Sequence, residues 1–241
     1  MKKRFVVNND YFHNIPGSPI AYWISKKFCA VFSSDQLNSI ATTKQGFATG
    51  DNNRFLRMWF EVEMPKLRFG VTDIDASKKS GGKWFPCNKG GGYRKWYGNN
   101  YYVVNWENDG KEMREFEKSV IRNPNYYFRK GITWSSLSNN LSLRYSDTGF
   151  LFESKGSMCF MNNDDLTLLE VLGLLNSKVV TEVMSIFSPT LDFHEGPMSK
   201  VPIMLPKDDN VKDIIEENIK IAKEDWNSFE ESWDYRKHPL I

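Results

Sequence analysis

The sequence predicts an α+β fold, in which a twisted and mainly antiparallel sheet of short strands is closed by helices. Short apolar segments separated by turn residues follow one another between Gly131 and Met161, a pattern typical of antiparallel strands. Residues 166–187 are instead apolar over a wide face at helical spacing, which predicts a largely buried helix. Aromatic residues make up 15% of the chain, and rings are favoured in sheets.

The first half of the chain predicts short elements after an irregular lead-in. Residues 1–19 end in the turn-prone segment Ile15-Pro16-Gly17-Ser18-Pro19, and the apolar spacing over 20–32 suits a short amphipathic helix. Asp51 is expected to cap a helical turn over 52–57. Extended segments are expected at 40–47, 58–62 and 101–106, and a charged helix at 111–120.

The second half predicts strands followed by helices. The strands are expected at 131–137, 141–145, 150–153 and 158–161. The helix over 166–187 should begin at a cap provided by Asn163, Asp164 or Asp165, and Asn176-Ser177 is expected to divide it in two. A short edge strand at 201–205 lies between two prolines, and a polar, acidic helix follows over 208–230. The expected organisation is a lead-in linker over 1–19, a domain over 20–206, and an acidic C-terminal spacer helix within 207–241.

Composition excludes several classes of protein. No apolar run approaches the ~18 residues that a transmembrane helix needs, and the basic start lacks the apolar core of a signal peptide. Cys29, Cys87 and Cys159 lie far apart without a CxxC pair, so neither a disulfide framework nor a zinc site is expected. We therefore expect a cytoplasmic protein without a membrane partner.

Residues 76–106 carry the strongest functional pattern. This stretch contains no Asp or Glu, although the net charge of the whole chain is only +2. Six cations, eight aromatic rings and six glycines are interleaved in it. Cations attract phosphates, rings stack on bases, and glycines allow the backbone to approach a polyanion, so the pattern predicts nucleic-acid binding. A solvated loop with several core aromatics is the alternative.

Candidate contact residues fall in three groups. Lysines of the basic stretch are expected to touch phosphates, Arg94 and Asn99 to read base edges, and Trp96 or Tyr97 to stack. A strand-to-helix turn before the stretch offers backbone N–H groups to an anion, and later residues could extend the surface unless strand alternation buries them. The full set is Thr49, Asn52, Asn53, Arg54, Arg57, Lys83, Lys89, Arg94, Lys95, Trp96, Tyr97, Asn99, Arg129, Lys130, Ser135, Arg144 and Lys155.

Two alternatives of other classes remain open. Asp147 followed by Glu153-Ser154-Lys155 faintly echoes the pattern of Mg²⁺-dependent nucleases. The acidic tail over 207–241 would repel phosphates, so it could instead dock a protein subunit. His194 beside Asp192 and Glu195 has no further His or Cys nearby in sequence, so a polar loop is favoured over a metal site.

Several stretches resemble one family of proteins. The segment from Gln45 to Arg57, followed by Trp59 and Glu61-Val62, resembles the start of the target-recognition region in Type IIG-like adenine methyltransferases. Lys83-Trp84-Phe85-Pro86 and the run from Arg94 to Asn100 look like its continuation, as does the segment from Val104 to Gly110. Residues 172–178 and 188–193 resemble the helix and loop that close such a domain. The ending from Glu224 to Asp234 resembles the PglX family of methyltransferases in BREX phage-defence systems.

The resemblance implies a function without catalysis in this chain. It implies sequence-specific recognition of double-stranded DNA, which positions an adenine for a methyltransferase domain in the same system. That domain would bind S-adenosylmethionine through a glycine-rich loop and hold the flipped adenine with an Asn-Pro-Pro-Tyr motif. Neither motif occurs here, and Asn123-Pro124-Asn125-Tyr126 is better explained as a turn. We expect no catalytic residue, metal or cofactor in this chain, and partners that include a methyltransferase domain or defence-complex subunits.

Overall fold

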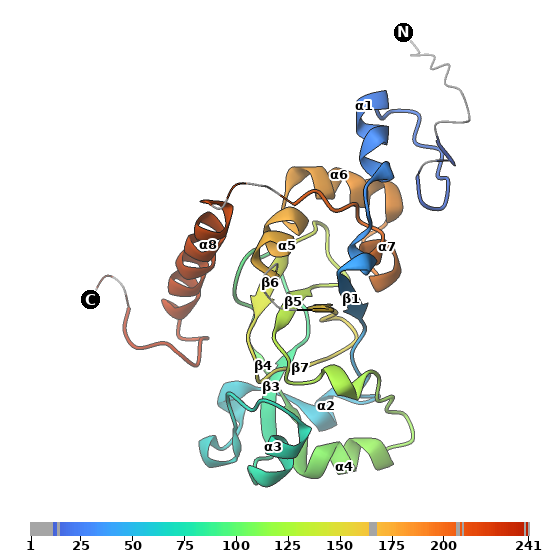
Figure 1. Ribbon diagram of the computed structural model, residues 1–241. Helices are drawn as coiled ribbons and strands as arrows, with labels where there is room; N and C mark the ends of the chain where they lie inside the picture. Colours follow the sequence, from blue (N-terminus) through green and yellow to red (C-terminus); the bar gives the residue numbers. More distant parts are fainter. Residues whose placement is uncertain are drawn as a thin grey trace.

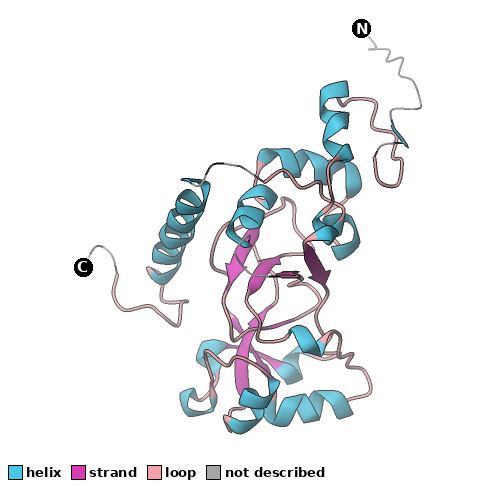
Figure 2. Cartoon of the chain, in the orientation of Figure 1, coloured by secondary structure: helices cyan, strands magenta, loops and turns pink. Residues whose placement is uncertain are grey.

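The computed structural model describes residues 12–13, 15–163, 168–205, 208, 210–238 and 240. It confirms the α+β class: helices surround two four-stranded sheets whose pairings are antiparallel with one exception (Figures 1 and 2). Among the residues described, no helix is both long enough and apolar enough to cross a membrane.

The first sheet has the strand order β1-β8-β5-β6 and is antiparallel throughout. Its strands are β1 (Ala41–Lys44), β5 (Gly131–Trp134), β6 (Leu143–Ser146) and β8 (Met158–Met161). Asn176 completes its edge, because the side-chain amide of Asn176 exchanges two 3.0 Å hydrogen bonds with the backbone of Leu143.

The second sheet has the strand order β2-β4-β3-β7. It consists of β2 (Leu56–Met58), β3 (Trp84–Asn88), β4 (Tyr102–Asn105) and β7 (Leu151–Phe152), of which β7 pairs with β3 in parallel. β3 lies inside the basic stretch that the sequence suggested was a loop. Its central residues Phe85 and Cys87 are buried, so this part of the stretch belongs to the core.

Helices cover both ends of the molecule (Figure 1). The α-helices are α1 (Lys26–Cys29), α2 (Asn52–Phe55), α3 (Ile74–Lys79), α4 (Glu107–Glu115), α5 (Leu168–Leu175), α6 (Lys178–Phe187), α7 (Glu195–Ser199) and α8 (Asn210–Asn227). The expected division of the long helix is confirmed: α5 ends at Leu175, and the Ser177 hydroxyl caps α6 by accepting a hydrogen bond from the Val180 amide. The Asp51 cap of α2 is also confirmed.

Strand β8 joins two hydrophobic clusters. Cys159 and Met161 belong to the cluster formed with α5 and α6, whereas Met158 and Phe160 belong to the cluster around the second sheet. Successive side chains of a strand point to opposite faces, so a strand buried on both faces reads as a continuous apolar run. This explains why the sequence predicts the bounds of β8 correctly.

Two expected strands are wrong, and each has a physical reason. The strand expected at 58–62 ends at Met58, where the Glu61 carboxylate accepts a 2.8 Å hydrogen bond from the Met58 amide and turns the chain. The strand expected at 201–205 is reduced to an isolated bridge between Pro202 and Gln36, since proline donates no ladder bond. Two of the proposed caps of the 166–187 helix, Asp164 and Asp165, lie outside the described residues.

The acidic C-terminal helix packs against the rest of the chain. Ile215 of α8 enters the first hydrophobic cluster beside α5. Beyond α8, the Trp59 indole donates a 2.8 Å hydrogen bond to the Glu231 carbonyl, and the Trp233 ring lies 5.0 Å from that of Phe69. The segment from α8 to Trp233 therefore contacts the part of the chain around the first sheet and the part around the second; we call this segment the C-terminal strap.

Candidate nucleic-acid interface

Residues 89–101 connect β3 to β4 and hold six of the seventeen predicted contact residues; we call this segment the glycine loop. Its first half is glycine-rich and lies close to other backbone. Gly90 has a φ of +87°, and a Cβ placed there would lie 2.7 Å from the Lys155 carbonyl oxygen. Only glycine tolerates both the positive φ and this approach, so the sequence requires Gly90 to bring the loop onto the turn at Lys155.

Two of the predicted contact residues fix the backbone of this loop. The Ser135 hydroxyl donates a 2.9 Å hydrogen bond to the Gly91 carbonyl, and the Asn99 amide donates a 2.8 Å bond to the Gly92 carbonyl. Both side chains are buried. In this conformation neither polar group is presented to a ligand, so the expectation that Asn99 reads a base edge is replaced by a role in shaping the loop.

The second half of the loop is also attached to the domain. The Arg94 guanidinium lies 2.7 Å from the Asp225 carboxylate and 5.1 Å from the ring centre of Trp226. The Lys95 ammonium donates a 2.7 Å hydrogen bond to the Asn176 carbonyl. The sequence predicts that Arg94 contacts base edges and that Lys95 contacts phosphates, but in this structure both charged groups bind other parts of the chain.

The two predicted aromatic contacts of the loop face the protein. The Trp96 backbone exchanges hydrogen bonds with Leu143 and Tyr145, which adds a bridge beside β6, and its half-buried ring packs on the first cluster. Burial raises the pKa of Tyr97 to about 12, and the Lys223 ammonium lies 5.5 Å from the Tyr97 ring centre. Neither ring is displayed for stacking.

Arg144 is buried beneath the glycine loop. Arg144 is 2% exposed, and its Nη1 donates a 3.4 Å hydrogen bond to the Arg94 carbonyl. Its Nε has no partner among the described residues. Burial lowers the pKa of Arg144 to about 10, helped by the nearby positive charge of Arg94. Because β6 is covered on both faces, with Leu143 at 0% and Arg144 at 2%, this predicted contact residue lies inside the molecule.

An exposed groove opens beside the first half of the glycine loop. It has a volume of about 400 Å³ and is lined by Gly91, Gly92, Tyr93, Leu137, Ser138, Asn139, Asn140 and Leu191. The Tyr93 side chain is 59% exposed, and Asn139 and Asn140 are exposed too. Sequence reasoning missed Asn139 and Asn140, and it counted Tyr93 only among the rings of the basic stretch. The signal that could have found them is the Ser138-Asn139-Asn140 turn between two strands, because asparagine pairs with adenine edges.

Two predicted lysines lie at the anchored start of the loop. The Lys89 ammonium lies 4.9 Å from the Tyr102 ring centre, and Lys155 is exposed on the turn that Gly90 touches. Together with the groove they form the groove surface, which we define as Lys89, Tyr93, Asn139, Asn140 and Lys155. It combines cations, an exposed ring and amides, which are residue types that contact nucleic acids.

The remaining predicted cations form separate clusters. The Arg54 guanidinium lies 2.8 Å from the Glu112 carboxylate and 4.9 Å from the Phe116 ring centre, which holds α2 against α4. Arg57 and Lys83 both lie near the Trp84 ring, 5.9 and 5.8 Å from its centre. Arg129 is exposed above Tyr126, and Lys130 lines a larger cleft beside α8.

The turn that precedes α2 is satisfied by its own side chains. The buried Thr49 hydroxyl donates a 2.6 Å hydrogen bond to the side-chain oxygen of Asn52, and the Asp51 carboxylate accepts one from the Arg54 amide. Asn52 and Asn53 are exposed. The anion site expected from free N–H groups is therefore partly occupied by the cap.

The motifs of the nuclease alternative have structural uses. The buried Glu153 carboxylate accepts hydrogen bonds from the Ser154 hydroxyl at 2.6 Å and the Lys155 amide at 2.9 Å. In the described part of the chain, no three His, Cys, Asp or Glu residues are grouped as metal ligands. The Asn123-Pro124 segment forms the expected turn, with the Asn123 amide bonded to the Gln45 carbonyl at 2.9 Å.

The sequence of this α+β domain is similar to one region of two much longer methyltransferases. No family model matches the sequence. The chain is 43% identical, over 242 residues, to the adenine-specific methyltransferase PglX of Lacticaseibacillus casei strain Zhang, covering 95% of this chain and 20% of that protein. It is 40% identical, over 237 residues, to the adenine-specific methyltransferase BrxX of Escherichia coli O9:H4 strain HS, covering 98% and 19%. The chain spans about a fifth of the length of these curated relatives.

Proposed function

We propose that this chain is the part of an adenine-specific DNA methyltransferase that recognises a sequence in double-stranded DNA. Methyl transfer, with S-adenosylmethionine, would be performed by a domain outside this chain. The observation that carries the proposal is the groove surface, in a chain that is similar to adenine-specific methyltransferases over nearly its whole length. A phage-defence system is the setting that the family resemblance implies.

The groove surface divides the work of recognition by residue type. Lys89 and Lys155 would contact phosphates, which sets the position of the duplex without choosing a sequence. Asn139 and Asn140 would pair with base edges, since an asparagine amide matches the donor and acceptor of adenine. The exposed ring of Tyr93 would stack or wedge against a base. Glycines 91 and 92 let the loop approach the duplex closely.

Other predicted residues would act further along the duplex. Arg57, Lys83 and Arg129 each lie near an aromatic ring. Such a cation–π contact leaves N–H groups of the guanidinium or ammonium able to bond to a phosphate. Asn52 and Asn53 are exposed at the start of α2. We include these five as flanking contacts, whereas Thr49, Arg94, Lys95, Trp96, Asn99, Ser135 and Arg144 would act by shaping the domain.

The test is a fluorescence titration of the chain on a random duplex pool at two salt concentrations, followed by sequencing of the bound fraction. Salt-sensitive binding that enriches one short motif is expected. The double change Lys89→Ala with Lys155→Ala should weaken binding to every sequence and flatten the salt slope by about 2. Asn140→Ala should relax the sequence preference at one or two positions. Lys111→Ala is the matched control, because Lys111 is 69% exposed on α4.

Other outcomes would favour the alternatives. Absence of binding even at low salt would contradict the proposal and favour a protein-docking module that uses the acidic C-terminal segment. A metal-dependent cut in plasmid DNA that Glu153→Gln abolishes would instead support the nuclease alternative. Equal losses from Lys111→Ala and from the double lysine change would show that binding reflects general charge and not the groove surface.

A further inference from the structure

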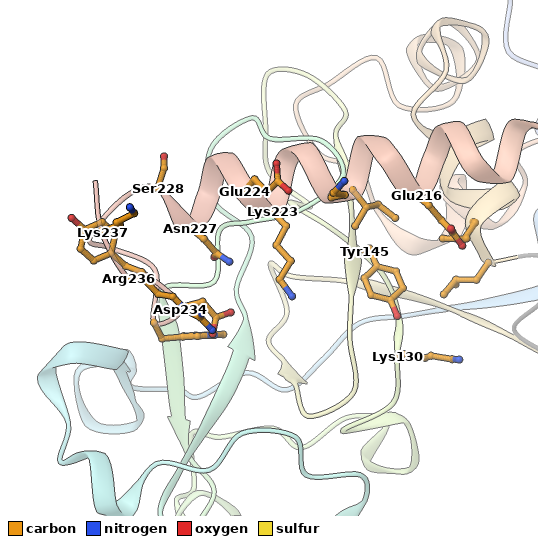
Figure 3. Close-up of a pocket in the computed structure, with 16 residues that line it drawn as sticks. Lys130, Tyr145, Glu216, Lys223, Glu224, Asn227, Ser228, Asp234, Arg236 and Lys237 are labelled. Atoms are coloured by element: carbon orange, nitrogen blue, oxygen red, sulfur yellow. The ribbon is translucent and has the colours of Figure 1, made fainter. Parts of the chain in front are cut away.

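A second and larger cavity lies between the C-terminal strap and the first sheet (Figure 3). We call it the α8 cleft; its volume is about 1260 Å³, and α8 with the segment after it forms one wall. Lys130, which immediately precedes β5, and Tyr145 of β6 belong to the opposite wall. Pockets for single small ligands usually measure about 300–1,000 Å³, so the α8 cleft has room for a longer molecule.

The charge within the α8 cleft differs from the charge of the whole tail. Positive side chains from three places meet there: Lys130 before β5, Lys220 and Lys223 from α8, and Arg236 and Lys237 from the segment after α8. The described acidic residues of the lining are Glu216, Glu224 and Asp234. The tail is acidic in sequence, yet among the described residues that line this cleft five charged groups are positive and three are negative.

The spacing of residues on α8 explains why the cleft is more positive than the tail as a whole. Residues three and four apart share one face of a helix, so Glu216, Lys220, Lys223 and Asn227 follow one another along the side of α8 that faces the cleft. Figure 3 shows Lys223 extending away from α8 on the side of the helix where Tyr145 and Lys130 lie, while Glu224, which also lines the cleft, points in another direction. The acidic residues Asp213, Glu217 and Asp225 are not part of the lining.

The α8 cleft is in contact with the glycine loop. The Lys223 ammonium lies 5.5 Å from the ring centre of Tyr97 in that loop, and Asp225, two residues further along α8, holds Arg94 of the same loop. A molecule bound at the glycine loop could therefore continue along α8 without leaving the protein surface. The arrangement places Lys223 of the α8 cleft beside the second half of the glycine loop, whose first half lines the groove.

We propose that the α8 cleft binds the phosphodiester backbone of the DNA that the groove surface recognises. This inference rests on the proposed function and assigns the C-terminal strap to DNA contact. Flexible lysines spaced along a helix suit successive phosphates, which need charge more than fixed geometry. Glu216 and Asp234 would repel a phosphate that was out of position, and so would limit where the backbone can lie.

The direct test is lysine footprinting of the intact chain. Reductive methylation, read by mass spectrometry, is compared with and without the selected duplex. Lys220, Lys223 and Lys237 are expected to be protected at least threefold by the duplex, whereas Lys111 on α4 should be modified equally in both samples. Millimolar inorganic phosphate serves as the second probe. Equal protection by phosphate alone would identify a site for free anions and would overturn the assignment to a DNA backbone.

Variants test the energetic contribution. Lys220→Ala with Lys223→Ala should weaken duplex binding about threefold to tenfold and lower the salt slope by about 2, while the enriched motif stays the same. Lys220→Arg with Lys223→Arg should retain binding, since the charges remain. Both lysines lie on an exposed helix face, and an unchanged thermal midpoint would show that the fold is intact.

The outcomes separate this inference from the proposed function. If the Lys89 and Lys155 changes weaken binding but the two α8 lysine changes do not, the α8 cleft assignment fails and the groove surface stands. If the chain binds no duplex at all, both fail. If the α8 changes alter the enriched motif, the cleft reads bases and the backbone assignment is overturned.

Discussion

Arg94 and Asp225 are 131 residues apart in sequence, yet their side chains form an ion pair of 2.7 Å. The pair joins the glycine loop to α8 at the point where the Trp226 ring lies beneath the Arg94 guanidinium, 5.1 Å away. The conformation of the loop therefore depends on the last part of the chain. A fragment that ends before α8 would keep the Lys95 and Trp96 contacts of the loop but would lose those that Arg94 makes with Asp225 and Trp226.

Trp226 should contribute more to this attachment than the ion pair does. The Trp226 side chain is 2% exposed and contacts Tyr101 with ring centres 4.9 Å apart. Trp226→Ala should lower the free energy of unfolding by about 3 kcal/mol, because a large buried side chain leaves a cavity. Asp225→Asn should lower it by about 1 kcal/mol or less, since the Asp225 side chain is 57% exposed. Urea denaturation of both variants checks the ranking; similar losses would contradict it.

Gly90 should be irreplaceable, whereas Gly92 should tolerate alanine. At Gly90 the φ of +87° and the 2.7 Å approach to the Lys155 carbonyl both oppose a side chain. Gly90→Ala should therefore cost about 1–2 kcal/mol of stability or more, and should lower DNA affinity by displacing the loop. Gly92 has an ordinary φ, and a Cβ there would meet no atom within 4 Å. Thermal melting and duplex titration of the two variants form a matched pair; equal effects would show that the turn at Lys155 is not what fixes the loop.

The sequence predicts secondary-structure elements well where a local pattern, such as an apolar run or a capping residue, determines them. The bounds of β8, the Asp51 cap and the break at Asn176-Ser177 follow from apolar runs and capping residues. The basic stretch is different, because Lys and Pro flank or interrupt β3 and local propensity does not show that Phe85 is in the core. Its strand character comes from pairing with β4, which is a tertiary effect.

The candidate site shows the same division. Residue types indicated which segments gather charge and rings, but not which side chains remain exposed. Arg144 lies on β6, which is covered on both faces, and the residue types of a short strand do not show whether its second face is covered. The ion pair between Arg94 and Asp225 joins residues that are 131 positions apart. Local residue spacing cannot predict such a contact. The net charge of the tail does not reveal the α8 lysines, because Lys220 and Lys223 share one face of the helix.

Replacing Arg144 with a hydrophobic residue of similar length should not harm the domain. Its guanidinium is buried, and its Nε is unpaired within the part of the chain that the structure describes. A buried charge without an anionic partner is unfavourable, so Arg144→Met should leave the free energy of unfolding unchanged or raise it by roughly 1–3 kcal/mol. Arg144→Ala, which leaves a cavity, should lower it. Denaturant titration tests stability, and duplex titration tests function. A specific loss of DNA binding by a stable Arg144→Met variant would restore Arg144 as a contact residue.

Tyr97 should make the domain sensitive to high pH. Burial, helped by the negative charge of Asp234, raises the pKa of Tyr97 from 10.0 to about 12 in the folded chain. Folding therefore favours the neutral phenol. This contribution is fully present below pH 10 and is lost as the pH rises toward 12, so the free energy of unfolding should fall over that window. Tyr97→Phe should reduce the fall. Chemical denaturation at several pH values between 9 and 12 checks this; identical slopes for the two proteins would contradict the assignment.

The three cysteines should be unreactive in the folded chain. Cys29, Cys87 and Cys159 are all buried, with exposed fractions of 7%, 1% and 0%. Burial raises the pKa of Cys159 to about 12 and raises that of Cys87 as well, which suppresses the reactive thiolate. Ellman's reagent should therefore modify the native chain slowly, beginning with Cys29, and should titrate three thiols after denaturation. Because access requires unfolding, the native reaction should accelerate in Trp226→Ala only as far as that variant lowers the free energy of opening. Rapid modification of Cys87 or Cys159 in the native chain would show that the second sheet or β8 opens locally.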